Sequence, residues 1–195
     1  MRRNSDTNRY ETFMSDANTG YNQAMLSLYV DGGGRDCGTG DQFAYYQTSG
    51  NSTTCSGVNA QVGRWYHVAV TRDSGGTRRF FVDGILVRTE TASPAPSDSS
   101  GRLTLGRAGD HNGEYFPGLV DEVRISNISR YSTNFTPPTY LFTSDSNTVV
   151  LYHLDAGTGQ TLLDSSGNGR NGTRGASTSS ETSDPSWSTD SPITQ

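Results

Sequence analysis

The chain has 195 residues, a formal net charge of −5 and 31% hydrophobic residues, a length that suits one domain or a domain with a small module. The acidic balance and the lack of basic runs exclude any electrostatic reason to expect a nucleic acid partner. No apolar run approaches the roughly 20 residues of a membrane-spanning helix, so we also expect no membrane insertion.

Apolar residues recur with a period of two, in short runs separated by glycine, asparagine, aspartate and serine, which is the pattern of β-strands. Between residues 64 and 87 it predicts a three-stranded meander, with a tight hairpin at Asp83-Gly84 because both turn positions favour positive φ. Outside that meander, strands are expected at residues 9–15, 24–30, 42–47, 102–106, 118–126 and 148–154, with one helical turn at 128–132. This pattern predicts an all-β fold, a two-sheet antiparallel β-sandwich.

The C-terminal region from residue 172 onwards is mainly serine, threonine and glycine. Alone, it is expected to be disordered, because it has few residues to bury. Trp187 and Ile193 are the only large apolar side chains there that could pack on a folded domain.

Four motifs stand out along the chain: WYHVAVT at 65–71, FVDG at 81–84, LTLG at 103–106 and FPGLVDEVRIS at 116–126. Their order is that of laminin-G-like jelly-roll domains, which have the concanavalin A-like lectin and glucanase fold. The chain resembles that family between about residues 9 and 140. The resemblance implies a concanavalin A-like jelly roll.

A further motif stands at an unexpected position. The sequences LYHLDAGTG at 151–159 and DSSGNG at 164–169 resemble the segment that usually opens such a domain. We therefore divide the chain into a sandwich core, residues 1–147, and a C-terminal segment, residues 148–195. The strand in this segment could return to the same sandwich as a permuted first strand, complete a neighbouring subunit or begin a truncated tandem copy.

Catalysis is not expected. Glucanases of this fold carry acidic residues alternating on one strand, so that an acid and a nucleophile flank the glycosidic bond. The five glutamates here form no such pair, and Asp121 and Glu122 are neighbours that would point to opposite faces of a strand. His67, His111 and His153 lack the spacing of metal ligands, and no serine lies in a nucleophile-elbow motif.

A structural calcium ion is the one cofactor considered, since the resemblance implies that calcium is common in these folds. Asp121 shares strand parity with apolar residues, and the glycine-rich turn containing Asp164 and Asn168 offers oxygen ligands. Asp155 is a weaker candidate. The alternative is a buried Asp121 bonded to an arginine or to backbone amides, and a plain Asx turn at Asp164.

Glycan binding would use exposed aromatic rings beside amide and carboxylate groups. The candidates are His111, Asn112 and Tyr115 in one polar loop, together with Trp187, and Tyr45 and Tyr46 are further aromatic candidates. The alternative for Tyr115 and its neighbour Phe116 is that they cap the sandwich edge.

Two cysteines, Cys37 and Cys55, flank the expected strand at 42–47 and would form a disulfide in an exported protein. N-glycosylation sequons occur at Asn51, Asn127, Asn134 and Asn171, and several are expected by chance in this composition.

Together these features predict a non-catalytic lectin-like module, extracellular or on a cell surface, that binds glycans or other surface polymers in adhesion. The alternative is a structural subunit, in which copies of the chain join through C-terminal strand exchange into an extracellular filament or surface array. A third hypothesis is an accessory domain of a glycoside hydrolase.

Overall fold

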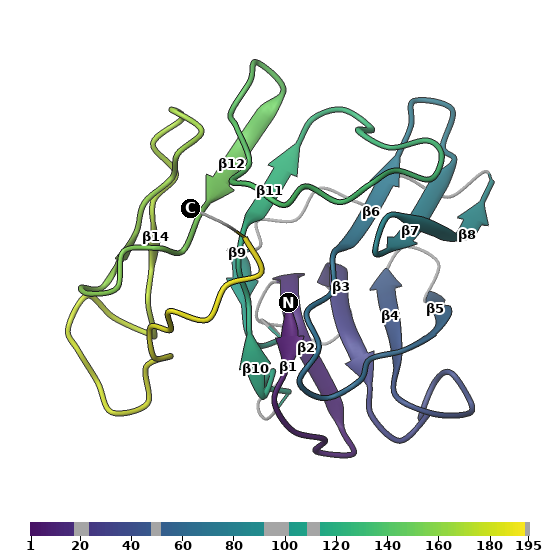
Figure 1. Cartoon of the computed structure of the whole chain (residues 1–195), viewed down its shortest axis with the longest axis horizontal. Coiled ribbons are helices and arrows are strands. Elements are labelled where there is room, and N and C mark those ends of the chain that lie inside the picture. The colour runs from purple at the N-terminus through teal and green to yellow at the C-terminus, as the bar shows by residue number, and fades with distance from the viewer. Residues whose placement is uncertain (18–23, 48–51, 92–101, 109–113, 194–195) are drawn as a thin grey trace. The chain divides into compact units, whose positions relative to one another are not determined.

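The computed structural model describes the chain except for residues 18–23, 48–51, 92–101, 109–113 and 194–195 (Figure 1). The described residues form only β-strands, turns and irregular segments, so the all-β prediction is confirmed. None of them forms a helix long and apolar enough to cross a membrane. The strands are β1 (Arg2–Arg3), β2 (Tyr10–Ala17), β3 (Ala24–Asp31), β4 (Gln42–Gln47), β5 (Ser52–Asn59), β6 (Val68–Arg72), β7 (Arg78–Val82), β8 (Ile85–Glu90), β9 (Arg102–Leu105), β10 (Gly118–Leu119), β11 (Val123–Ser126), β12 (Thr148–Tyr152), β13 (Thr161–Leu162) and β14 (Gly172–Thr173).

The chain divides into two compact units. The first contains residues 1–120 and 131–136, and the second contains residues 121–130 and 137–195. The first unit holds an antiparallel five-stranded sheet in the order β5-β4-β3-β2-β9 and a three-stranded sheet in the order β6-β7-β8.

The core of the first unit lies between these two sheets. Val30 and Phe43 are register partners on β3 and β4 and are fully buried, and Phe80 and Val82 of β7 belong to the same apolar cluster. Since alternate residues of a strand face opposite sides, this register places Tyr29 and Ala44 on the other, outer face of the five-stranded sheet.

The predicted hairpin joins β7 to β8. Asp83 and Gly84 have φ values of 49° and 75°, as a turn with two left-handed positions requires, and Val82 pairs with Ile85. The Asp83 carboxylate also accepts a 2.9 Å hydrogen bond from the backbone N–H of His67, which ties the turn to the start of β6.

The helical turn predicted at residues 128–132 is absent, and that prediction is wrong. Tyr131 and Phe135 instead stack in parallel, with ring centroids 3.6 Å apart, and Phe135 also makes an edge contact with Phe81. The N–H of Phe135 donates to the carbonyl of Gly84 at 2.9 Å. Packing on the three-stranded sheet thus outweighs a weak local preference for helix.

The strand predicted at residues 118–126 is interrupted. β10 ends at Leu119, β11 begins at Val123, and Glu122 between them has a φ of 51°. Strand parity therefore does not carry across Asp121, so the pattern that suggested an inward Asp121 does not apply.

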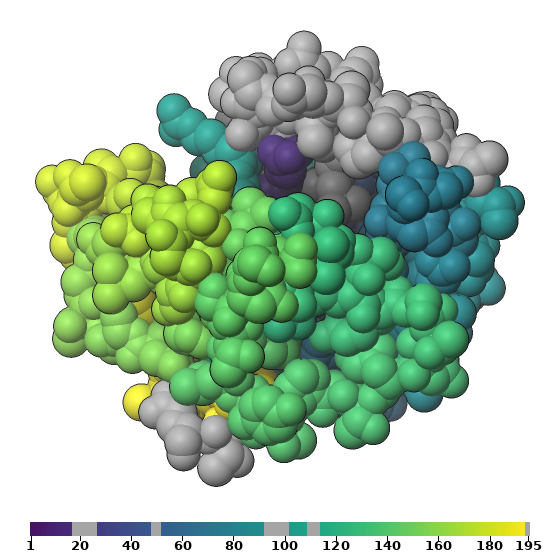
Figure 2. Space-filling view, turned by 90° about the horizontal axis from the view of Figure 1, so that it is seen from above, coloured from purple at the N-terminus to yellow at the C-terminus, as the bar shows by residue number. Residues whose placement is uncertain are grey.

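The second unit is built on two short antiparallel pairs, β11 with β12 and β13 with β14. Val123 pairs with Tyr152 and Ile125 with Val150, so β12, which ends in the first two residues of the misplaced opening motif, pairs with β11 of the same chain. In the space-filling view of Figure 2, the green and yellow-green atoms of the C-terminal part lie side by side without a gap between them.

The polar tail folds back within this unit. Nε1 of Trp187 donates to the carbonyl of Gly159 at 3.2 Å, and the guanidinium of Arg174 lies 5.9 Å from the ring centroid. Arg174 also donates to the side chain of Gln160 at 2.7 Å and to the carbonyl of Pro185 at 3.0 Å. Trp187 thus anchors the tail, as its apolar character suggested.

Candidate functional site

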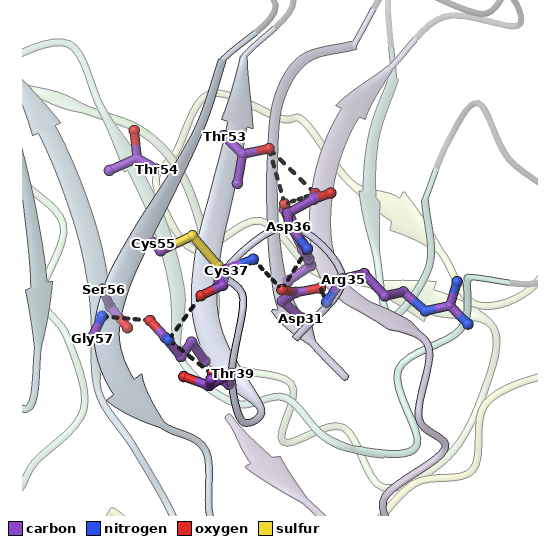
Figure 3. Close-up of a disulfide and its surroundings, with 12 residues drawn as sticks. Asp31, Arg35, Asp36, Cys37, Thr39, Thr53, Thr54, Cys55, Ser56 and Gly57 are labelled. Carbon is purple, nitrogen blue, oxygen red and sulfur yellow. Dashed lines mark hydrogen bonds between the residues drawn. A yellow bond between two sulfur atoms is a disulfide. The ribbon is translucent and has the colours of Figure 1, made fainter. Parts of the chain in front are cut away.

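A disulfide fastens a glycine-rich loop to the five-stranded sheet (Figure 3). The loop follows β3, contains Cys37, and is linked to Cys55 on β5. The predicted disulfide is therefore confirmed. Because Cys55 pairs in register with Ala44, it stands on the outer face, and the loop is tied to that side of the sheet.

The carboxylate of Asp31 organises this loop from within. Asp31 is fully buried and accepts backbone N–H groups from Arg35 at 3.1 Å, Asp36 at 2.9 Å and Cys37 at 2.7 Å (Figure 3). A buried carboxylate requires such partners to offset its desolvation. Three successive amides converging on one side chain fix the backbone that presents Asp36.

Asp36 is exposed, and its carboxylate is surrounded by hydroxyl groups. It accepts hydrogen bonds from the hydroxyls of Tyr10 and Tyr29, each at 2.9 Å, and from Thr53 at 3.3 Å (Figure 3 shows Thr53). Burial and then the hydrogen bond to Asp36 raise the pKa of Tyr10 to about 12. Burial is likewise the main cause that raises the pKa of Tyr29, so both phenols stay protonated donors.

Aromatic rings line the sheet beside this carboxylate. Tyr10 and Tyr29 meet edge to face, with centroids 5.6 Å apart, and the guanidinium of Arg35 lies 5.6 Å from the centre of the Tyr10 ring. Tyr46 shares the outer face, because it pairs with Thr53 in register. We call the exposed and half-buried members of this group the Asp36 patch, which consists of Tyr10, Arg35, Asp36, Tyr46 and Thr53.

The Asp36 patch combines three kinds of group that hydroxyl-rich ligands use: a carboxylate acceptor, hydroxyl and guanidinium donors, and aromatic faces. Sequence reasoning named only Tyr46 of these five. The alternation of Tyr29 and Asp31 in the sequence of β3 was a signal that this face of the strand is polar and aromatic. The position of Asp36 on the same face had no such signal, because it depends on the disulfide and the Asp31 turn.

The other predicted glycan residues lie elsewhere. His111 and Asn112 lie outside the described residues. Tyr115 is 58% exposed and forms a β-bridge with Arg107. Tyr45 is a wrong candidate, because it is 1% exposed on the core face, where its ring meets Phe80.

Trp187, the remaining glycan candidate, is half-buried in the second unit, where its indole N–H is bonded to Gly159. Tyr115 belongs to the first unit, so the predicted aromatic residues are divided between the two units.

The residues predicted to bind calcium have separate sets of partners. Asp121 accepts hydrogen bonds from Ser191 Oγ at 2.6 Å and from the N–H of Glu122 at 3.0 Å. Asp164 accepts from Leu151 N–H at 3.0 Å and from Ser166, which describes the Asx-turn alternative.

Asn168, the third predicted ligand, donates through its amide to the carbonyls of Thr148 and Val149. Across the part of the chain that the structure describes, no three His, Cys, Asp or Glu side chains are grouped to hold a metal ion. Calcium binding thus stays a prediction. The weaker candidate, Asp155, is exposed and contributes electrostatically to raising the pKa of Asp121, after the larger effect of burial.

Three glutamates are engaged in different places. Glu11 binds Arg3, with Oε2 at 2.5 Å from Nε. Glu90 accepts hydrogen bonds from Arg78, Thr54 and Tyr45. Glu122 accepts the N–H of Phe142 at 2.8 Å and faces His153. Each of these carboxylates has its own cationic or polar partners.

The sequons differ in their surroundings. Asn134 is exposed, and its Oδ1 accepts the N–H of Leu86 at 2.8 Å. Asn171 is exposed and accepts the N–H of Asp164 at 2.9 Å, and Asn127 is exposed after β11. Asn51 lies outside the described residues. Glycosylation at any of them stays a prediction.

Comparison with known families matches residues 1–134 to a laminin-G model described as the concanavalin A-like lectin/glucanases superfamily. The match covers the first unit except its last two residues, with its disulfide and the Asp36 patch, and it includes β11 of the second unit. No curated protein sequence and no solved structure is significantly similar to the chain.

Proposed function

Because the chain belongs to the concanavalin A-like lectin/glucanases superfamily, we propose that it is a non-catalytic, extracellular lectin-like module that binds a glycan at the Asp36 patch. The observation that carries this proposal is the exposed Asp36 carboxylate, held by the buried Asp31 turn beside Tyr10 and Thr53. A glycan hydroxyl can replace the hydroxyl of Tyr10 or Thr53 at this carboxylate, because both side chains are half-buried, while the buried Tyr29 keeps its own hydrogen bond.

The aromatic groups support the same ligand class. Sugars present apolar C–H faces as well as hydroxyls, and tyrosine rings offer both an apolar surface and a polar tip. Tyr10 and Tyr46 are half-buried, so part of each side chain remains accessible while its position is fixed by the sheet. Preorganisation of this kind reduces the entropy lost when a ligand binds.

The disulfide supports an extracellular location, because disulfides persist in oxidising compartments. The non-catalytic part of the proposal is supported by three of the glutamates, Glu11, Glu90 and Glu122, which are engaged in contacts that join strands or loops. A retaining glycosidase needs two carboxyl groups about 5–5.5 Å apart on either side of the scissile bond.

A glycan array tests the proposal, with the chain applied once in calcium and once in a chelator. We expect binding to a subset of glycans, lost in Tyr46→Ala and kept in Tyr115→Ala. The comparison is matched, because both variants remove a tyrosine with an accessible surface and only Tyr46 belongs to the Asp36 patch. Loss in Tyr115→Ala with retention in Tyr46→Ala would move the site to the loop containing His111 and Asn112.

The two array conditions also test the calcium prediction. Binding that is kept in calcium and lost in the chelator would show that a calcium ion takes part. Assembly into a filament by C-terminal strand exchange, and service as an accessory domain of a glycoside hydrolase, stay predictions. The first is tested by the mass of the purified chain in solution.

A further inference from the structure

One edge of β12 pairs with β11, and its other edge is covered by the turn of residues 164–170. Within this turn, the Asp164 carboxylate accepts the N–H of Leu151 at 3.0 Å, and the N–H of Ser165 donates to the carbonyl of Leu151 at 2.8 Å. Leu151 therefore has both of its backbone groups occupied, as it would if another strand lay beside it.

Side chains of the same turn occupy the neighbouring carbonyls. The amide of Asn168 donates to the carbonyls of Thr148 at 2.9 Å and Val149 at 3.0 Å. The carbonyl of Val149 also accepts Nη1 of Arg170 at 2.9 Å and the hydroxyl of Ser166 at 3.3 Å. These contacts imitate the backbone donors and acceptors of a strand, although the turn itself is not one.

The turn is held in shape by its own first residue. The second oxygen of Asp164 accepts the N–H of Arg170 at 2.9 Å and the hydroxyl of Ser166 at 2.8 Å, while Gly167 and Gly169 adopt φ values of 84° and 70°. Burial alone would raise the pKa of Asp164, but the hydrogen bonds from Ser166, Leu151 and Arg170 outweigh it and lower the pKa to about 2. The carboxylate is thus ionised at neutral pH, as a good acceptor should be.

The strand beneath this turn would associate readily if it were uncovered. β12 has the sequence TVVLY, without charge, glycine or proline, and Val150, Leu151 and Tyr152 are buried. An apolar, β-branched strand with a free edge is a template for pairing with another chain. The covering turn is mostly exposed, so it is held by its polar contacts more than by apolar packing.

We propose that the turn of residues 164–170 is a plug that closes the outer edge of β12 against strand addition by a second copy of this chain. A second copy is the fitting partner, because two uncovered β12 edges can pair antiparallel about a two-fold axis, each offering the same surface. This inference goes beyond the proposed glycan binding and does not depend on it.

The test measures molar mass by light scattering over a wide concentration range. Asn168→Ala and the double variant Asp164→Ala/Asn168→Ala are compared with the natural chain and with Ser165→Ala. Ser165→Ala is the matched control, because it lies in the same turn while its contact to Leu151 uses the backbone. We expect monomers for the natural chain and the control, weak dimers for Asn168→Ala and stronger dimers or larger species for the double variant.

A rescue variant identifies the surface involved. Adding Val149→Lys to the double variant places a charge on the exposed edge and should restore the monomer. Near-ultraviolet circular dichroism checks that Asn168→Ala, the milder change, stays folded. The proposal is overturned if folded Asn168→Ala and the double variant remain monomeric at every concentration, if Val149→Lys leaves the association unchanged, or if the natural chain already associates through β12.

Discussion

The carboxylate of Glu122 lies 2.6 Å from Nδ1 of His153, although the two residues are 31 positions apart. Glu122 interrupts the strand predicted at 118–126, and His153 directly follows β12. The same carboxylate accepts the N–H of Phe142 at 2.8 Å, so a side chain that is 5% exposed joins three segments of the second unit. Glu122, which the sequence predicted to be a strand residue, thus connects three segments of the second unit through its side chain.

This attachment predicts a pH dependence of stability. Burial raises the pKa of Glu122 above its ordinary value of 4.5, and the hydrogen bonds from Phe142 and His153 reduce the rise without cancelling it. The folded state therefore holds this proton more tightly than the unfolded state. The resulting stabilisation is fully present below pH 4.5 and is lost as the pH rises through the raised value.

We expect Glu122→Gln to remove the loss of stability at rising pH, because an amide keeps an acceptor for the N–H of Phe142 and carries no charge to desolvate. The free energy of unfolding, measured by denaturant titration at successive pH values, should exceed that of the natural chain by an amount that grows above pH 4.5. Glu181→Gln, an exposed glutamate in the same unit, is the control and should show no such growth. Parallel pH profiles for Glu122→Gln and the natural chain would contradict the account.

Replacing Arg3, the buried arginine of β1, should lower the free energy of unfolding strongly. The guanidinium of Arg3 is 1% exposed and bonds Glu11 at 2.5 Å, Asp41 at 2.7 Å and Asp6 at 2.7 Å. Arg3→Ala would leave the Glu11 carboxylate buried without its cation, a loss of about 3–5 kcal/mol. Denaturant unfolding should show this, whereas Arg64→Ala, which breaks an exposed ion pair, should cost at most about 1 kcal/mol. Equal losses in the two variants would contradict the assignment.

Removing the disulfide should destabilise the first unit. Replacing both Cys37 and Cys55 by serine frees a loop closed across 18 positions, and the chain-entropy model gives a loss of about 3 kcal/mol. Denaturant unfolding of the natural chain with and without a reducing agent should show a similar difference. A double variant as stable as the oxidised chain would show that the loop needs no covalent tie.

Asp31 should position the glycan site without touching the ligand. Asp31→Asn replaces one acceptor oxygen by an amide donor facing the N–H groups of Asp36 and Cys37, so the loop should shift and glycan affinity should fall several-fold. Asp73→Asn is a matched control, because Asp73 caps the turn at Thr77, away from the Asp36 patch. Equal glycan affinity in Asp31→Asn and the natural chain would show that the Asp31 turn does not position the site.

Much of the fold follows from local signals. The Asp83-Gly84 hairpin was predictable because the turn chemistry and the flanking apolar runs agree, and both residues have the positive φ expected. The break at Glu122 was not, since apolar residues continue on both sides of it and only the contacts to His153 and Phe142 reveal the change of direction.

The candidate site was harder to predict than the fold. Tyr45 and Tyr46 are neighbours on one strand, and only the register with β3 decides that Tyr45 is buried and that Tyr46 shares the face of Tyr10. Asp36 reaches that face through a loop fixed by the disulfide and by a buried carboxylate. Contacts that depend on such long-range closure leave little trace in a single sequence.

The most direct test of the proposed function is the dissociation constant of the strongest array glycan for Asp36→Asn, measured by calorimetry beside that of the natural chain. A hydrogen bond to a charged group contributes about 1.5–3 kcal/mol, so binding should weaken roughly tenfold or more. An unchanged dissociation constant for Asp36→Asn, or a natural chain that binds no glycan at all, would contradict the central claim.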